Sequence, residues 1–286
     1  MSLNPAPARR RRPFTQVDVF SAEHYRGNPL AVVVDAEGLT TARMQQFANW
    51  TNLSETTFLL PPTHPDADYR VRIFTAHEEF PFAGHPTLGS AHAWLEAGGI
   101  PKRDGVLIQE CAAGLVRVKC DDGRLAFAAP PLTRSGPVGE EQLQRIAAGL
   151  RLPRTELLDA TWLVNGPEWI GVLLESAAQV LSIRPDYFAM DGLKVGVIGP
   201  YPDAGGPGFE VRTFIPGDAA AEDPVTGSFN AGAAQWLIGT GRAPASYMVA
   251  QGTVLGRAGR VHVESAGSDI WVGGTSTTCI SGTVLL

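Results

Sequence analysis

Four polar side chains in three short segments of the sequence have the chemistry of an acid–base site. Glu55 lies at the edge of an expected strand that is largely apolar, and a carboxylate buried there can act as a general acid or base near neutral pH. His85 follows Gly84 at an expected helix start, where the positive end of the helix dipole favours a neutral imidazole. Asp223 precedes a second expected helix start, which carries Ser228. Together these residue types can move a proton and bind a small anion.

Each of these residues also has a purely structural interpretation. Glutamates are rarely buried, so the local sequence alone favours a surface position for Glu55 at the edge of a strand. His85 could simply cap its helix, and a Glu-Asp-Pro segment with Asp223 is also what an ordinary helix cap looks like. Taken one at a time, the residues leave both interpretations open.

The first helix start offers a place to bind an anion. Residues 70–75 alternate polar and apolar side chains, which predicts a strand that leads into a loop and then a helix. Glycine at position 84 permits backbone shapes that other residues resist, and Pro86 suits a first helical turn. The first amides of a helix have no acceptor within the helix, so they can bind a carboxylate or an oxyanion.

The same strand–loop–helix plan occurs a second time. Val71-Arg72-Ile73-Phe74 is echoed by Val211-Arg212-Thr213-Phe214, and both helices that follow carry Trp-Leu near their ends. We predict a duplicated domain whose two helix starts face each other across a cleft and together bind one small anion. At the second helix start, the amide of Gly227 would contact this anion. His85 and Ser228 hold equivalent places in the two copies, which strengthens the functional interpretation.

The remaining pattern predicts a strand-rich fold with one apolar helix in each half. The helix expected at 229–238 carries almost no charge, which is typical of a buried helix. We therefore expect a mixed α/β (α+β) fold in which a curved sheet wraps around one central helix, made twice. A doubly wound parallel sheet is the alternative, but several strands here follow one another without an intervening helix.

The other predicted elements are short. Residues 130–137 are rich in proline and glycine and are expected to form a linker. Helices are expected at 40–50 and 140–150. Strands are expected at 14–20, 30–34, 106–110, 115–119, 125–128, 162–164, 169–174, 193–198, 209–214, 260–264, 269–272 and 275–286, with a hairpin turn at 121–123.

Composition excludes several classes of function. The net charge of −6 gives no support for a nucleic-acid partner, and no run approaches the roughly 20 apolar residues of a membrane span. The basic run at 9–12 is expected to be a solvated tail. Cysteines 111, 120 and 279 lack metal or disulfide spacing, which indicates reduced thiols in a cytoplasmic protein. No metal site is expected, because histidines 24, 64, 77, 92 and 262 show no ligand spacing, and no nucleotide-binding motif is present.

Ordered motifs along nearly the whole chain resemble the PhzF family of phenazine-biosynthesis-like isomerases. The segments that carry this resemblance are Asp18-Val19-Phe20, Gly27 to Val33, Leu53-Ser54-Glu55-Thr56-Thr57-Phe58, Arg72 to Thr75, Phe82 to Gly89, Glu222 to Ser228, Gln251-Gly252, Gly256-Arg257 and Val272-Gly273-Gly274.

The resemblance implies a diaminopimelate-epimerase-like fold of two similar domains, each a barrel-like sheet around a central helix. We expect the first domain at 14–130 and the second at 131–278, with a last strand at 279–286 that can return to the first. The resemblance also implies a site in the cleft between the domains, no cofactor and commonly a homodimer.

The resemblance further assigns roles to residues. It implies that Glu55 is the acid/base and that His85 and Asp223 belong to the catalytic site. It also implies that Ser228 contacts the substrate, and that Gly84 and Gly227 supply amides for the substrate carboxylate. The segments at 24–26 and 219–221 look less typical of the family and are candidates for the substrate entrance.

The expected activity is that of a cofactor-independent isomerase of a small carboxylate-bearing metabolite, in which Glu55 moves a carbon-bound proton. One alternative is an epimerase or racemase that uses Glu55 opposite Asp223. Related racemases use two cysteines at the helix starts, whereas this chain has Gly84-His85 and Gly227-Ser228 there. A second alternative is a non-catalytic binder of anionic metabolites or of a protein partner on the same fold.

Overall fold

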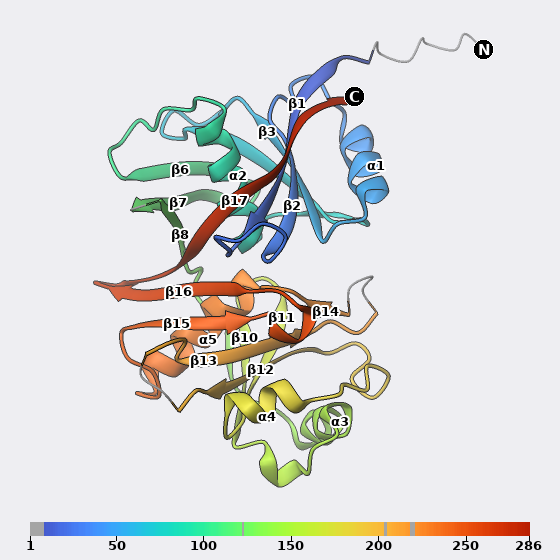
Figure 1. Cartoon of the computed structure of the whole chain (residues 1–286), viewed down its shortest axis with the longest axis vertical. Coiled ribbons are helices and arrows are strands. Elements are labelled where there is room, and N and C mark those ends of the chain that lie inside the picture. Colours follow the sequence, from blue (N-terminus) through green and yellow to red (C-terminus); the bar gives the residue numbers. More distant parts are fainter. Residues whose placement is uncertain (1–8, 122, 203–204, 218–220) are drawn as a thin grey trace, which may run out of the picture.

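The protein has two halves, stacked along the long axis of the molecule, and one long strand belongs to both (Figure 1). The structure is a computed structural model and describes residues 9–121, 123–202, 205–217 and 221–286. Residue 122 of the expected hairpin turn and residues 219–220 of the expected entrance loop therefore lie outside the described residues.

The first half is a closed barrel of eight strands around one helix. Its neighbours in order are β1 (Arg11–Val19), β2 (Asn28–Val33), β3 (Glu55–Leu60), β4 (Tyr69–Phe74), β6 (Val106–Cys111), β7 (Gly114–Asp121), β8 (Arg124–Ala128) and β17 (Asp269–Leu285), which returns to β1. Helix α2 (Gly84–Glu96) fills the barrel with nine buried residues. Helix α1 (Thr41–Thr51) packs outside it, with Thr40 as its N-cap as predicted, and β5 (Glu79–Phe80) pairs with β4.

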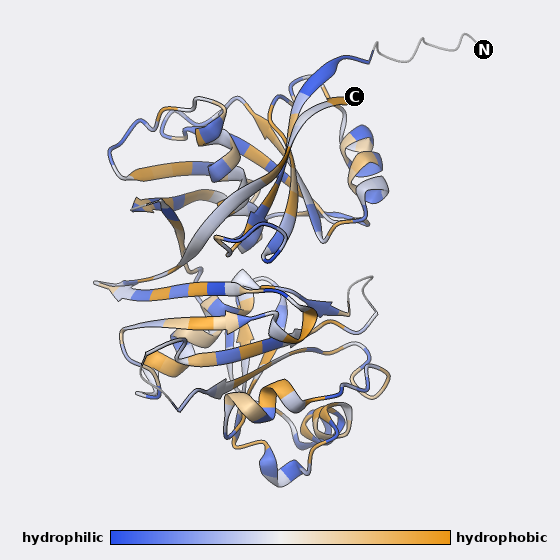
Figure 2. Ribbon diagram, in the orientation of Figure 1, coloured by the Kyte–Doolittle hydropathy of each residue, from blue (hydrophilic) through white to orange (hydrophobic). Residues whose placement is uncertain are grey.

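The second half repeats this order of strands. Its members are β9 (Arg134–Pro137), β10 (Asp159–Val164), β11 (Glu168–Leu173), β12 (Lys194–Pro200), β13 (Phe209–Phe214), β15 (Ser246–Gln251), β16 (Gly259–Ala266) and the first part of β17, with β14 (Glu222–Asp223) beside β13. Helix α5 (Gly227–Gly239) lies against this sheet, and helices α3 (Glu140–Leu150) and α4 (Ala177–Ser182) lie outside it. Figure 2 shows hydrophobic and hydrophilic residues alternating along β16, the pattern of a strand with one buried face.

Equivalent strand pairs in the two halves also have the same relative orientation, parallel or antiparallel. The pairs β2–β3 and β4–β6 are parallel, and so are β11–β12 and β13–β15. The predicted mixed α/β fold with a sheet around a central helix, made twice, is therefore confirmed.

Strand β17 belongs to both halves. It pairs with β16 up to Gly273, with β8 from Trp271 to Thr275, and with β1 from Ser276 onwards. Two separate strands at 269–272 and 275–286 were the expectation, and this is wrong because Gly273 and Gly274 continue the strand. A Cβ on Gly273 would lie 2.2 Å from the carbonyl oxygen of Leu125, so glycine there serves close packing rather than a turn. The domain limits at 130/131 and 278/279 stay a prediction.

Two expected irregular segments are strands. Residues 134–137 of the expected linker form β9, which pairs with β10 through Pro137; proline is tolerated there because β9 lies at an edge. Arg11 and Arg12 of the expected tail belong to β1. Arg12 is 4% exposed, and its side chain donates to the Asp35 carbonyl oxygen at 2.6 Å. Elements β15 and α4 were not anticipated from the sequence. None of the helices in the described residues has the length and apolar character needed to cross a membrane.

Candidate active site

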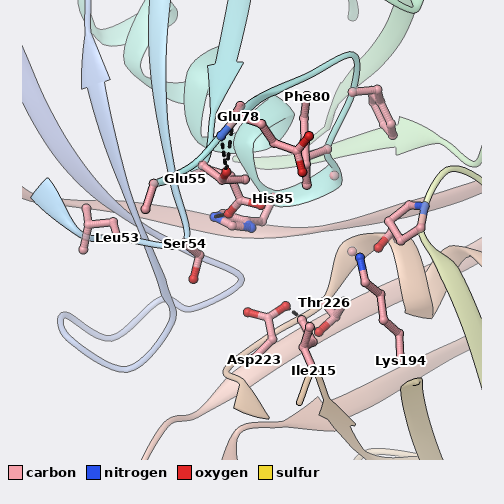
Figure 3. Close-up of a pocket in the computed structure, with 18 of the residues that line it drawn as sticks. Leu53, Ser54, Glu55, Glu78, Phe80, His85, Lys194, Ile215, Asp223 and Thr226 are labelled. Carbon is pink, nitrogen blue, oxygen red and sulfur yellow. Dashed lines mark hydrogen bonds and ion pairs between the residues drawn. The ribbon is translucent and has the colours of Figure 1, made fainter. Parts of the chain in front are cut away.

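A cavity of about 290 Å³ lies between the two halves, where α2 and α5 begin. All six residues predicted for the site line it: Glu55, Gly84, His85, Asp223, Gly227 and Ser228. Figure 3 shows the carboxylate of Glu55 and the imidazole of His85 on the side of the first half, with Asp223 facing them from the second. Residues that are up to 173 positions apart in the sequence are therefore brought into one place.

Glu55 is the first residue of β3, where the strand opens into the cavity. Its side chain is only 14% exposed, so the surface position favoured by the local sequence is wrong. Strands β2 and β3 are parallel, and Glu55 pairs with Leu30 near the start of β2. Both strands therefore begin at the end of the barrel that faces the cavity, and this puts Glu55 at the cavity. One carboxylate oxygen, Oε2, lies 3.4 Å from Nε2 of His85.

His85 is a buried, neutral group. Burial lowers the pKa of its imidazole to about 3, so the ring carries no charge near neutral pH. A neutral ring was expected, but from the helix dipole, whereas the cause here is burial. The alternative that His85 caps its helix is wrong, because no side chain caps the start of α2. Its two nitrogens face opposite ways, Nε2 toward Glu55 and Nδ1 toward the side-chain amide of Asn28 at 3.4 Å.

Asn28 determines which nitrogen of His85 carries the proton. It is fully buried, and its Nδ2 donates to Oδ1 of Asp223 and to the carbonyl oxygen of Val225, both at 2.9 Å. These two acceptors fix the amide with its NH₂ group toward His85, because the reverse orientation would put its oxygen against two other oxygens. An NH₂ group facing Nδ1 disfavours a proton on that nitrogen, so we assign the proton to Nε2, which points at Glu55.

Asp223 is not a helix cap, so the structural interpretation offered for it is also wrong. The N-cap of α5 is Thr226, and no side chain caps that helix. The Thr226 hydroxyl donates instead to Oδ2 of Asp223 at 2.6 Å and accepts from Nε2 of the buried Gln251 at 3.0 Å. Both carboxylate oxygens of Asp223 therefore accept hydrogen bonds that hold the group toward the cavity.

A buried ion pair stabilises the segment that carries Asp223. Arg212 of β13 is 2% exposed, and it binds both carboxylate oxygens of Glu222 at 2.8 Å. The same arginine donates to the carbonyl oxygens of Val180 and Ile183 at the end of α4. Since Glu222 precedes Asp223 in β14, this network fixes the segment that presents Asp223.

The starts of the two central helices touch each other. A Cβ placed on Gly227 would lie 3.1 Å from Cα of Gly84, and one on Gly84 would lie 2.8 Å from the ring of Phe127. Gly84 was expected because of an unusual backbone shape, but neither glycine has a positive φ angle, so the actual reason is space. With no side-chain cap on either helix, the amides of Gly84, His85, Gly227 and Ser228 lack an acceptor within their helices.

Ser228 is oriented by the second half. Its Oγ accepts a hydrogen bond from Nε1 of Trp169 at 3.0 Å, and its carbonyl oxygen accepts one from Nδ2 of Asn165 at 2.8 Å. Trp169 and Asn165 also line the cavity. Ser228 can therefore donate its hydroxyl proton to a ligand while Trp169 fixes its oxygen.

Sequence reasoning gave no functional role to three residues of this region: Asn28, Trp169 and Lys194. Asn28 lies within a family motif but looked like a turn residue. Lys194 enters the cavity from the start of β12, and the register between strands is the information that would have revealed it. Within the described residues, no group of three or more His, Cys, Asp or Glu side chains is placed to hold a metal ion.

Comparison with known proteins identifies the family. The model of the phenazine biosynthesis-like protein family, PhzC-PhzF, matches residues 17–282. The chain is 37% identical to antisense-enhancing sequence 1 of Schizosaccharomyces pombe, over 94% of this chain and 97% of that protein. It is 32% identical to trans-2,3-dihydro-3-hydroxyanthranilate isomerase of Pseudomonas aeruginosa, over 89% of this chain and 91% of that enzyme.

A solved structure shows the same architecture. The PhzF-family phenazine biosynthesis protein of Enterococcus faecalis superposes with a TM-score of 0.80 at 26% identity, over 97% of this chain and all of that one. The match extends over both halves, and the resemblance that the motifs indicated is confirmed. The chain is therefore an isomerase and belongs to the phenazine biosynthesis-like protein family.

Proposed function

We propose that this protein isomerises a small carboxylate-bearing metabolite without a cofactor, and that Glu55 moves a carbon-bound proton of that metabolite. The observation that carries this proposal is the placement of Glu55 and the paired helix starts around one cavity of about 290 Å³. A metabolite bound there would have Glu55 as a base on one side and, on the other, backbone amides that lack an acceptor within their helices.

The helix starts would bind the substrate carboxylate. Amides of Gly84 and Gly227, with the Ser228 hydroxyl, can donate to its oxygens, and both helix dipoles present their positive ends. The same donors would stabilise negative charge that spreads into the carboxylate when a neighbouring carbon loses its proton.

Glu55 would then act first as base and afterwards as acid. Its carboxylate takes the proton from one carbon, the electron pair of that C–H bond moves into the adjoining π-system, and the protonated Glu55 returns the proton to another carbon. The product has the same atoms as the substrate, with one double bond moved. His85 would orient the carboxylate through its Nε2–H, and Asp223 would bind a polar substituent of the substrate.

The substrate of the relative from Pseudomonas aeruginosa is a natural first compound to test. The name of that enzyme gives trans-2,3-dihydro-3-hydroxyanthranilate, which has a carboxylate. The name of the relative from Schizosaccharomyces pombe specifies no reaction, so the test should extend to other unsaturated small carboxylates.

Solvent exchange tests the role of Glu55. In heavy water we expect deuterium at the shifted carbon of the product, and Glu55→Gln should lower the rate by about 10²- to 10⁴-fold, the usual contribution of an acid/base group. Glu37→Gln makes the same chemical change at an exposed position far from the cavity and should leave the rate unchanged. Full activity of Glu55→Gln would refute the assignment.

An epimerase that uses Glu55 and Asp223 is the second candidate. The observation in its favour is that these two carboxylates line one cavity from opposite halves. Inversion at a single carbon, with no movement of a double bond, would identify this reaction. The hydrogen bonds that Asp223 accepts from Asn28 and Thr226 suit a fixed binding group better than a second base.

We also propose, from the family resemblance, that the protein is a homodimer and, from its composition, that it is cytoplasmic with no nucleic-acid or membrane partner. All three cysteines are free in the structure, which agrees with a reducing compartment. Light scattering on the protein as it elutes from a size-exclusion column would measure its mass directly. A mass equal to that of one chain would refute the dimer.

A further inference from the structure

Lys194 occupies the position in the second half that Glu55 occupies in the first. Glu55 precedes Thr56, which pairs with Phe74 of β4; Lys194 precedes Val195, which pairs with Phe214 of β13. Phe74 and Phe214 end the two copies of the Val-Arg-x-Phe motif. The register therefore places an ammonium where the first half places its carboxylate.

The cavity has little other positive side-chain charge. Its carboxylates are Glu55, Glu78 and Asp223; of its two histidines, His77 is exposed at the edge, and the buried His85 is neutral near pH 7. Among the described residues that line it, Lys194 is the one lysine or arginine. An anionic substrate that enters between three carboxylates needs a positive partner, and Lys194 is the side chain placed to supply it.

Lys194 is available for a ligand. Figure 3 shows it on the opposite side of Thr226 from Asp223, with its nitrogen pointing into the cavity. The structure gives it no salt bridge within the described part of the chain, whereas the buried Arg212 is fully paired with Glu222. A side chain of intermediate exposure that ends in a cavity can bind a ligand without breaking an existing pair.

The symmetry of the two halves separates Lys194 from Glu55. Gly84 and Gly227 hold equivalent places in the two halves and contact each other, so they lie on the axis that relates the halves. A carboxylate bound to their amides therefore sits midway between Glu55 and Lys194, which are also equivalent. A reacting carbon on the side of Glu55 leaves the opposite side of the ligand facing Lys194. The backbone of Lys194 lies beside Trp169, which orients Ser228 on that same side.

We propose that Lys194 binds a second anionic group of the substrate, a carboxylate or a phosphate, on the side away from Glu55. The substrate of this enzyme is then a dianion, with one carboxylate on the helix starts and another anionic group on Lys194, and it differs in this from trans-2,3-dihydro-3-hydroxyanthranilate, which has a single carboxylate. This inference rests on the proposed function for the place of the first carboxylate, and it adds the class of substrate.

Calorimetric binding of three simple probes tests it. Benzoate carries one anionic group, isophthalate carries two carboxylates, and 3-phosphonobenzoate carries a carboxylate and a phosphonate. The wild type should bind at least one of the two-anion probes about tenfold or more tightly than benzoate, since a charged hydrogen bond has about that effect. The preferred probe tells whether the second group is a carboxylate or resembles a phosphate.

The variant Lys194→Met should remove this preference. The affinity for the preferred two-anion probe should fall by about tenfold or more, while the affinity for benzoate should change by less than about threefold. Lys194→Arg should keep most of the preference because it keeps the charge. Lys119→Met, on the outer surface beside Glu264, is the matched control and should bind all probes like the wild type.

Three results would overturn the proposal: equal binding of one-anion and two-anion probes by the wild type, an equal loss for both in Lys194→Met, or no binding of any probe. The variant Glu55→Gln separates this proposal from the catalytic one. If Glu55→Gln stays active while Lys194→Met loses its selectivity, the assignment of the base fails and the dianion site stands. If Glu55→Gln is inactive and Lys194→Met keeps its selectivity, the reverse holds.

Discussion

Replacing Asn28 by alanine tests the connection between the two halves. The Asn28 side chain comes from the first half, and it contacts His85 in that half and Asp223 and Val225 in the second. Its removal takes away the two hydrogen bonds that this side chain donates to the second half, and it also removes the group that favours the Nε2–H form of His85. We therefore expect Asn28→Ala to change both stability and catalysis.

The structure sets the size of the effect on stability. One lost hydrogen bond, at 2.9 Å, ends on the carboxylate of Asp223, and such bonds contribute about 1.5 to 3 kcal/mol. The other, also at 2.9 Å, ends on the carbonyl of Val225 and contributes about 0.5 to 1.5 kcal/mol. The free energy of unfolding should fall by about 2 to 4.5 kcal/mol, and urea titration would measure the difference.

Asn49→Ala is the matched control for this variant. Asn49 also donates to a backbone oxygen at 2.9 Å, that of Ala76, but at an exposed position. Its replacement should change the free energy of unfolding by no more than about 0.5 kcal/mol. A cost for Asn28→Ala as small as this would show that the amide does not join the halves as described.

Nitrogen chemical shifts of labelled histidine test the effect on His85 directly. The wild type should show a neutral ring with its proton on Nε2, and Asn28→Ala should shift the population toward the form with the proton on Nδ1. The rate of solvent exchange into product should fall with it. A wild-type ring protonated on Nδ1 would refute the reasoning.

Two further predictions follow from the same site. Because burial lowers the pKa of His85 to about 3 from an unfolded value near 6.5, the unfolded state alone binds this proton between those pH values, so stability falls as the pH drops from about 6.5 to about 3. The contribution of His85 to the change of the unfolding free energy with pH is at most about 1.4 kcal/mol per pH unit. Urea titrations at several pH values should show that His85→Gln lacks this contribution, and an unchanged pH dependence would contradict the neutral buried ring. Gly227→Ala puts a methyl group 3.1 Å from Cα of Gly84, so it should cost about 1 to 3 kcal/mol and weaken isophthalate binding, whereas Gly239→Ala, with no atom within 4 Å, should do neither. Wild-type thermal stability and affinity in Gly227→Ala would show that the helix starts are not in contact.

The sequence was sufficient for the architecture because the fold is built from local signals that occur twice. The Val-Arg-x-Phe strands, the glycine at each helix start and the apolar helices can all be seen within about 30 residues. Alternation along strands and low charge along α2 and α5 indicate burial directly. Errors occurred where one residue type has two uses, as at Gly273-Gly274, which was interpreted as a break and is a close contact within one strand.

The site was predicted less completely, because its contacts join distant segments. The bond between Asn28 and Asp223 spans 195 positions, and nothing near Asn28 in the sequence indicates it. The burial of Glu55 depends on what covers the end of β3, so its local sequence was misleading. Lys194 was missed because its equivalence to Glu55 exists only in the pairing register of two strands.

The differences between the two halves bear on the mechanism. A duplicated backbone gives two equivalent positions beside the helix starts, and a two-base racemase would be expected to use them for two similar groups. Here Lys194 holds in the second half the position that Glu55 holds in the first, and Ser228 holds the position that corresponds to His85. In the proposed mechanism, the first half therefore supplies the groups that move a proton, and the second supplies groups that bind and orient the substrate. This division favours one acid/base that serves two carbons of the same substrate, because a single proton carrier needs its substrate held firmly from the other side.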